Sequence, residues 1–248
     1  MRSAYDDSSF SYSTYWLGRQ YEHRSEVIAL RRLLKGRRFP RAVDVGGGYG
    51  RLTPTLADYC QAVSVVEPST KLRALAAKNF PVVAGTAQDT NLPASSQDLV
   101  ASIRVLHHLP DLSPTFSEFF RILKPDKFLV IEFANSANFK ARVRSFLNNR
   151  PLLLVPVDIR SPQNIKKKTI PFVNHHPLTV LKLLRRHGFQ PLQILSVSNL
   201  RSTFLKKILP LPLLLFLESV SQSLLSHFYF GPSIFILAQR TIDKHKTL

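Results

Sequence analysis

The chain contains the stretch Arg41-Ala-Val-Asp-Val-Gly-Gly-Gly-Tyr-Gly50, in which a short run of β-branched residues leads directly into glycines. Only nine glycines occur in 248 residues, and four of them stand at positions 46, 47, 48 and 50. Glycine permits a tight turn and lets a ligand approach the main chain closely. The stretch therefore predicts a buried strand that ends in a ligand-binding turn.

Strand-like and helix-like segments alternate after this turn. Short apolar runs predict further strands over residues 62–66, 81–84, 99–104 and 128–133, and helical spacing predicts helices over residues 51–59, 70–79 and 113–123. Alternation on this scale is typical of a parallel sheet with right-handed crossovers. We expect an α/β, Rossmann-like fold with a mostly parallel sheet and helices on both faces.

Additional segments flank this core. A helix over residues 21–35 precedes it, so residues 1–40 are predicted to be a lead-in with a cap helix, and residues 41–248 the main domain. The alternation breaks after the fifth strand. We predict helical insertions over residues 136–178 and 200–230, after the fifth and sixth strands, that form an acceptor pocket or a lid.

An acidic residue, Glu67, ends the second predicted strand. A carboxylate at this place can accept both hydroxyls of an adenosine ribose, in nicotinamide sites and in S-adenosylmethionine sites alike. The nicotinamide pattern has a further glycine at the position of Arg51. The spacing of the glycines therefore departs from the nicotinamide pattern.

The stretch from Asp44 to Gly50 resembles the first motif of class I S-adenosylmethionine-dependent methyltransferases. Residues 85–93, 98–109 and 121–126 resemble later motifs of the same family, closest to the small-molecule group that includes the ubiquinone and menaquinone enzymes. The resemblance implies S-adenosylmethionine as the cofactor. It implies cofactor-binding roles for Asp44, Gly46, Gly48, Gly50, Glu67, Ala87, Gln88 and Arg104.

Two positions depart from the family pattern. Thr86 stands where many relatives carry an aspartate that contacts adenine, so we assign the adenine contact to Ala87 and Gln88. Asp126 and Lys127 replace a pair of glycines in a turn that we place away from the cofactor.

Histidines are the candidates for acceptor chemistry. His107 and His108 follow the fourth strand, at the sheet edge where ligands bind, and an imidazole there could remove a proton near neutral pH. A structural or substrate-lining role is the alternative. His175 and His176 either line the acceptor pocket or cap a helix that begins at Pro177. We take His107, His108 and His176 as catalytic candidates, and no spacing predicts a metal site.

The aromatic and basic residues ahead of the core have two interpretations. Tyr15, Trp16, Arg19 and Tyr21 either fold over the cofactor as a lid or pack against the edge of the sheet.

The chain is strongly basic, with 34 lysines and arginines against 16 acidic residues and a net charge of +18. This charge favours anionic partners such as nucleic acid or anionic lipid, or it is an ordinary solvated surface. The motif for methylation of exocyclic base amines is absent after the fourth strand. We therefore expect a small-molecule or lipid-like acceptor, with an RNA-directed methyltransferase and a non-catalytic cofactor-binding partner protein as alternatives.

Location follows from three features of the sequence. Residues 1–25 contain no apolar secretory core, and Cys60 is the only cysteine, so we expect a cytoplasmic protein. The apolar residues 208–217 are too few for a span of about 20 residues. They could rest on an anionic membrane surface, so peripheral membrane contact stays open.

Overall fold

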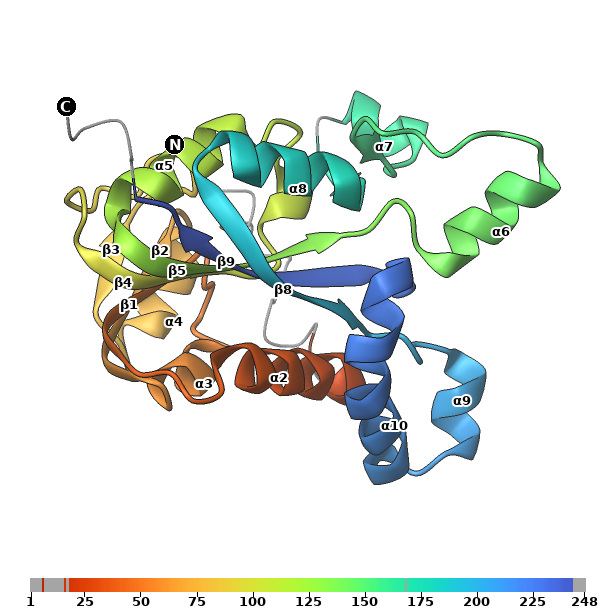
Figure 1. Ribbon diagram of the computed structural model, residues 1–248, viewed down its shortest axis with the longest axis horizontal. Coiled ribbons are helices and arrows are strands. Elements are labelled where there is room, and N and C mark those ends of the chain that lie inside the picture. The colour runs from red at the N-terminus through yellow and green to blue at the C-terminus, as the bar shows by residue number, and fades with distance from the viewer. Residues whose placement is uncertain (1–5, 7–15, 17, 168, 243–248) are drawn as a thin grey trace.

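The computed structural model describes residues 6, 16, 18–167 and 169–242 (Figure 1). A seven-stranded sheet with the strand order β3-β2-β1-β4-β5-β9-β8 forms its centre. The first five strands pair in parallel, whereas β9 lies antiparallel between β5 and β8. The expected mostly parallel sheet is confirmed. The strands are β1 (Phe39–Val45), β2 (Cys60–Glu67), β3 (Val82–Ala84), β4 (Gln97–Ser102), β5 (Leu123–Ala134), β8 (Phe189–Val197) and β9 (Ser233–Arg240).

Helices cover both faces of this sheet, as expected (Figure 1). A short two-stranded ladder, β6 (Val157–Asp158) with β7 (Val173–Asn174), lies outside it. The helices are α2 (Gln20–Leu34), α3 (Thr53–Ala57), α4 (Thr70–Ala76), η2 (Leu106–His108), α5 (Ser113–Ile122), α6 (Phe139–Leu147), α7 (Pro162–Lys166), α8 (Pro177–Arg186), α9 (Thr203–Ile208), α10 (Leu211–Leu224) and η3 (Leu225–Phe228).

Two apolar cores lie on opposite faces of the sheet. Successive residues of a strand point to opposite faces, so Val43 packs with α5 and α8, and Ala42 packs with α2. Val100 packs in the same core as Val43, and Leu99 packs in the same core as Ala42. Burial on both faces explains why these strands contain continuous apolar runs.

Strand β5 begins earlier than the sequence predicts, at Leu123 instead of residue 128. Its pairing with β4 shifts register between Gln97 and Leu99, and Asp126 takes a positive φ of 60° at this irregularity. The residues Lys124-Pro-Asp-Lys127 do not form an apolar run, because they lie at the bulge. The sequence therefore does not mark the part of the strand before residue 128. Asp126 adopts the left-handed conformation in the turn where relatives have glycines.

The first insertion is not purely helical. Besides its helices it contains the β6–β7 ladder, which the helical insertion predicted over residues 136–178 did not include. Most of the predicted lead-in, including Tyr15, lies outside the described residues. Within the part of the chain that the structure covers, none of the helices combines the length and the apolarity that a membrane span requires.

Candidate functional site

The glycine-rich turn begins where β1 ends, at the carboxyl edge of the sheet. Gly46, Gly48 and Gly50 have positive φ angles of 72°, 62° and 86°. A Cβ atom on Gly46 would lie 2.3 Å from Cγ2 of Val105, which follows β4. The turn therefore packs directly against the neighbouring strand, and only glycine fits at position 46.

Two carboxylates, Asp44 and Glu67, lie beside this turn. Glu67 accepts hydrogen bonds from the backbone N–H groups of Gly48, at 3.0 Å, and Ser69, at 2.9 Å. Asp44 accepts one from the Thr53 hydroxyl at 2.7 Å. The residues stand near the carboxyl ends of the adjacent parallel strands β1 and β2. The structure thus brings the predicted acid and the predicted turn together.

Burial changes the proton affinity of both carboxyl groups. It raises the pKa of Asp44 to about 6, against the opposing effects of the Thr53 hydroxyl and the charge of Arg51. It also raises the pKa of Glu67, although the two backbone amides lower it. In the part of the chain that the structure describes, no three His, Cys, Asp or Glu side chains are grouped to hold a metal ion. The pair is suited to an organic cation or to hydroxyl groups.

Residues 85–90 form a turn after β3, at the same edge of the sheet. The hydroxyl of Thr86 accepts hydrogen bonds from the backbone N–H groups of Gln88, at 3.3 Å, and Asp89, at 3.1 Å. Threonine thus closes the turn in the way that aspartate commonly does. Ala87 is buried in the core, whereas Gln88 is exposed. Of these two residues, only Gln88 therefore has a side chain that a ligand could contact.

A buried ion cluster lies between α2 and the glycine-rich turn. Glu26 of α2 accepts hydrogen bonds from Arg51, at 2.5 Å, and from Arg104, at 2.8 Å. The guanidinium carbon of Arg51 lies 3.6 Å from the centre of the Trp16 ring. Arg104 follows β4 with a positive φ of 65°, and its backbone N–H donates to Glu132. The cluster ties Trp16 and α2 to the turn.

The residues that were interpreted either as a lid or as packing against the sheet lie in different places. Trp16 is buried over Arg51, next to the turn. Tyr21 is buried on α2 and donates a hydrogen bond to Glu218 at 2.6 Å, so it packs in the body of the protein. Arg19 is the N-cap residue of α2. Of these residues, Trp16 is the one that covers the site.

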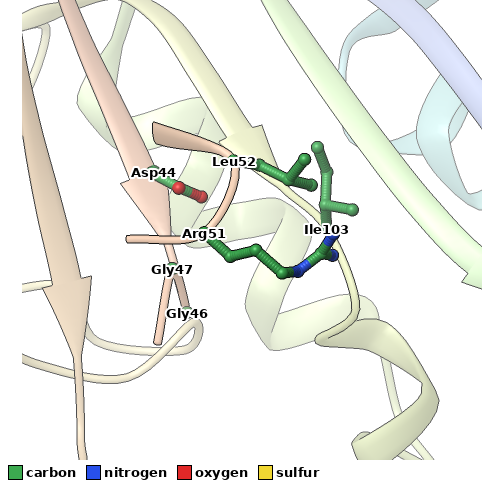
Figure 2. A pocket seen from close by; sticks show the side chains of 6 residues that line it. All are labelled: Asp44, Gly46, Gly47, Arg51, Leu52 and Ile103. Atoms are coloured by element: carbon green, nitrogen blue, oxygen red, sulfur yellow. The ribbon is translucent and has the colours of Figure 1, made fainter. Parts of the chain in front are cut away.

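The pocket beside the turn has room for about one water molecule. Figure 2 shows the side chain of Arg51 crossing it toward Ile103, opposite Asp44. The chemistry fits a sulfonium nucleoside, because the buried carboxylate of Asp44 and the bare backbone of Gly46 and Gly47 line this pocket, and Glu67 holds the same turn through the N–H of Gly48. Because the Arg51 side chain crosses this pocket, we expect it to move when the cofactor binds. The pocket is lined by Asp44, Gly46, Gly47, Arg51, Leu52 and Ile103.

Trp16 offers a direct test of this movement because it is the only tryptophan of the chain. We expect S-adenosylmethionine to change its fluorescence emission, since the displaced Arg51 guanidinium leaves the indole ring. A fluorescence titration measures the change, and calorimetry gives the affinity independently. An unchanged spectrum at calorimetric saturation would show that Arg51 stays on Trp16 when the cofactor binds.

His107 and His108 form η2 and contact Phe172 of the first insertion. The ring centres of His107 and Phe172 lie 4.7 Å apart, and those of the two histidines 4.0 Å apart. His107 is buried, and among the described residues its Nδ1 has no hydrogen-bond partner. His108 is partly exposed, and its Nδ1 lies 2.9 Å from the carbonyl oxygen of Pro171.

This contact fixes the tautomer of His108. A carbonyl oxygen only accepts, so Nδ1 carries the hydrogen and the neutral ring has its lone pair at Nε2. Burial lowers the pKa of both His107 and His108 below the ordinary value, and the charge of Arg104 lowers both further. Both rings are therefore neutral near pH 7, and His108 can accept a proton.

His175 and His176 both make hydrogen bonds that stabilise the fold. His176 caps α8, because its Nδ1 accepts from the backbone N–H of Leu178 at 3.3 Å and Pro177 is the first helical residue. The capping alternative is the one observed. His175 is buried, with Nε2 3.1 Å from the carbonyl oxygen of Leu106, and it links the first insertion to η2.

No sequence pattern above predicts that Glu26 and Arg51 are partners. One feature of α2 does indicate that Glu26 has a buried partner. Glu22 and Glu26 stand four residues apart on the face of α2 that also buries Ala29 and Leu30. Acidic residues on the apolar face of a helix are rarely buried unless they are paired with a cation.

Comparison with known proteins gives a family for the central region. Residues 43–131 match the family model described as a methyltransferase domain. This range runs from β1 into β5 and contains the glycine-rich turn, Glu67 and η2. A comparison with curated proteins finds no match for the chain.

Solved structures share the fold over most of the chain. An S-adenosylmethionine-dependent methyltransferase of Thermotoga maritima, described as a possible histamine N-methyltransferase, has a TM-score of 0.64 and 18% identity, covering 96% of this chain and 98% of its own. One from Mesorhizobium loti has a TM-score of 0.61 and 19% identity, covering 87% and 98%. The cyclase SpnF has a TM-score of 0.60 and 15% identity, covering 88% and 82%.

Such low identities show the fold alone, and the cyclase illustrates that one fold can serve different reactions. The family assignment depends on the matched domain and on the motifs within it. Residues 43–131 are a methyltransferase domain, and the chain has the fold of S-adenosylmethionine-dependent methyltransferases over most of its length.

Proposed function

We propose that this enzyme acts in the cytoplasm and methylates an uncharged small-molecule or lipid-like acceptor. The aromatic cluster of His107, His108 and Phe172 carries the proposal. Burial keeps both imidazoles neutral, so η2 and Phe172 offer polarisable rings that add no charge of their own. Such a surface suits an apolar ring or chain better than a phosphate backbone.

Cofactor binding is assigned to the residues around the glycine-rich turn. Asp44 would hold the ammonium group, Glu67 the ribose hydroxyls, and the turn would contact the methionine part through its main chain. Arg104, paired with Glu26 at 2.8 Å, would supply the positive charge that faces the cofactor carboxylate. The full set is Asp44, Gly46, Gly48, Gly50, Glu67, Ala87, Gln88 and Arg104.

S-adenosylmethionine, when bound, would supply a sulfonium methyl group, whose carbon bonds to the acceptor atom as its bond to sulfur breaks and the neutral thioether leaves. The chain must orient the partners, exclude water and, for a hydroxyl acceptor, remove a proton. His108 meets the last need, because its Nδ1–H is held by Pro171 and Nε2 can accept the proton. His107 packs against it and holds the ring in place. The lone pair of His176 is used in the helix cap, so we assign the proton step to His108.

The acceptor class is tested by methyl transfer into separated cell fractions. The enzyme is incubated with methyl-labelled S-adenosylmethionine and with lipid extract, water-soluble metabolites or total RNA. We expect label in the lipid extract or in the least polar metabolites. Label in RNA would replace this proposal by an RNA-directed activity. Cofactor binding without transfer to any fraction would favour a non-catalytic role.

The same assay tests His108 through His108→Asn, which keeps a donor for the Pro171 carbonyl but removes the base. We expect turnover to fall about a hundredfold with unchanged cofactor affinity. The matched control is His227→Asn, since the His227 Nδ1 also faces a backbone carbonyl, that of Leu224 at 3.3 Å. Unchanged turnover in His108→Asn would show that the acceptor needs no base from this residue.

A further inference from the structure

The exposed apolar side chains are concentrated on two segments. Of the 21 large apolar side chains that are exposed in the described residues, nine lie between residues 139 and 167 and eight between residues 203 and 228. Single exposed apolar residues are ordinary, whereas clusters mark surfaces that bind a partner.

The first of these segments, residues 139–167, is named the arm here. It contains α6, β6 and α7 and extends beyond the end of β5 (Figure 1). None of its residues is buried. Its base is fixed by Phe139, whose ring stacks on Phe230 at 4.8 Å and whose N–H donates to the Phe230 carbonyl at 2.9 Å. The arm thus has an anchored base and no core of its own.

Helix α6 of the arm is amphipathic. Phe139, Val143, Phe146 and Leu147 follow the spacing of one helix face. Phe146 is 86% exposed and Leu147 is 75% exposed. Side chains of this size, so completely exposed on one face, indicate a partner that covers them.

The charge of the arm identifies the kind of partner. The arm contains seven lysines and arginines and one acidic residue, a net +6 of the +18 of the chain. The acid, Asp158, is paired with Arg160 at 2.6 Å. On α6, Lys140 and Arg144 flank the apolar face. An apolar face bordered by lysine and arginine is typical of helices that lie in the surface of an anionic bilayer. RNA would match the charge but would leave Phe146 and Leu147 uncovered.

The second segment lies at the same edge of the sheet. Strands β5 and β8 both run antiparallel to β9, so their carboxyl ends point the same way. The arm follows β5, and α9 follows β8 with Phe204 and Ile208 exposed by 68% and 60%. The glycine-rich turn follows the parallel strand β1. Both apolar segments therefore emerge from the edge that carries the methyltransferase site.

We propose that the arm, together with α9 and α10, docks this enzyme on an anionic lipid bilayer with its active-site edge toward the membrane. This surface goes beyond the proposed acceptor, because vesicle binding needs neither cofactor nor turnover.

Co-sedimentation with vesicles tests the surface. The full chain is mixed with vesicles of phosphatidylcholine alone, or of phosphatidylcholine and phosphatidylglycerol in equal parts. We expect binding to the anionic vesicles, weakened by salt, and little binding to the neutral ones. Equal binding to both, or binding to neither, would overturn the proposal.

Variants assign the binding to the arm. Phe146→Glu should weaken binding to anionic vesicles about tenfold, because it places a charge on the inserting face. Lys140→Glu with Arg144→Glu should weaken it about thirtyfold. The matched controls are Ile242→Glu, at an apolar residue that is 58% exposed outside both segments, and Lys78→Glu after α4. Unchanged S-adenosylmethionine affinity in each variant confirms its fold.

Other kinds of partner would give different results with these variants. If Phe146→Glu converts a dimer to a monomer and wild-type protein ignores vesicles, the arm is an interface between copies. If the charge variants lose RNA binding while Phe146→Glu keeps it, and vesicles are ignored, the partner is nucleic acid. If vesicle binding is retained in Phe146→Glu, the apolar face of α6 does not insert. Each of these results would overturn membrane docking by the arm.

Discussion

Replacing Asp44 by asparagine is expected to weaken S-adenosylmethionine binding about a hundredfold, because a buried charge that pairs with the cofactor ammonium is lost. The same change is expected to stabilise the cofactor-free protein near neutral pH. Asparagine keeps an acceptor for the Thr53 hydroxyl, 2.7 Å away in the wild type, so the cavity loses a charge and keeps a hydrogen bond.

The pH dependence of this stabilisation follows from the pKa of Asp44. Burial raises the pKa to about 6 in the folded protein, from 3.8 for a free side chain. The folded state therefore binds the proton more tightly, and this contribution to stability is lost as the pH rises through about 6. The advantage of Asp44→Asn should be absent below about pH 4 and reach about 2 to 3 kcal/mol above pH 6.

Urea unfolding at a series of pH values measures the free energy of unfolding, and calorimetry measures cofactor affinity. The control is Asp58→Asn, since Asp58 is 58% exposed and lies 3.6 Å from an exposed Arg31. Such a surface pair contributes little, so both quantities should hardly change. Full cofactor affinity in Asp44→Asn would remove Asp44 from the ammonium site. Lower stability near neutral pH would show that the interactions of the charged carboxylate with Thr53 and Arg51 outweigh the cost of burying its charge.

The central fold could be predicted because its signals are local. Apolar runs marked the strands that pair in parallel, and Pro177 marked the start of α8. The carboxyl ends of adjacent parallel strands meet at one edge, so the approach of Glu67 to the turn after β1 also follows from the sequence.

The features that the sequence did not reveal depend on distant contacts. The early start of β5 at Leu123 depends on a bulge opposite β4, which no apolar run marks. The stacking of Trp16 on Arg51 and the pairing of Arg51 with Glu26 join three separate segments. Local patterns carry no information on such pairs, so the closure of the pocket could be found only in the structure.

Replacing Gly46 by alanine is expected to lower the free energy of unfolding by about 3 kcal/mol or more. One part of this loss is the positive φ of 72°, which costs a residue with a Cβ about 1 to 2 kcal/mol. The other part is steric, because the new Cβ would lie 2.3 Å from Cγ2 of Val105, and relieving such overpacking costs about 1 to 3 kcal/mol. Val105 packs against the core that Val43 shares with α5 and α8, and this packing limits the movement of its side chain.

A second substitution separates the two parts. Val105→Ala removes Cγ2 and leaves the Cβ of residue 105 at 3.4 Å, an ordinary contact, so it should rescue the steric loss and leave the φ strain. Urea unfolding of both single variants and the double variant should give a coupling of about 1 to 3 kcal/mol in favour of the pair. Gly18→Ala is the control, since a Cβ there would have no neighbour within 4 Å. If the two losses simply add, the turn moves away from Val105 when a Cβ is present, and the close contact with β4 does not explain the glycine.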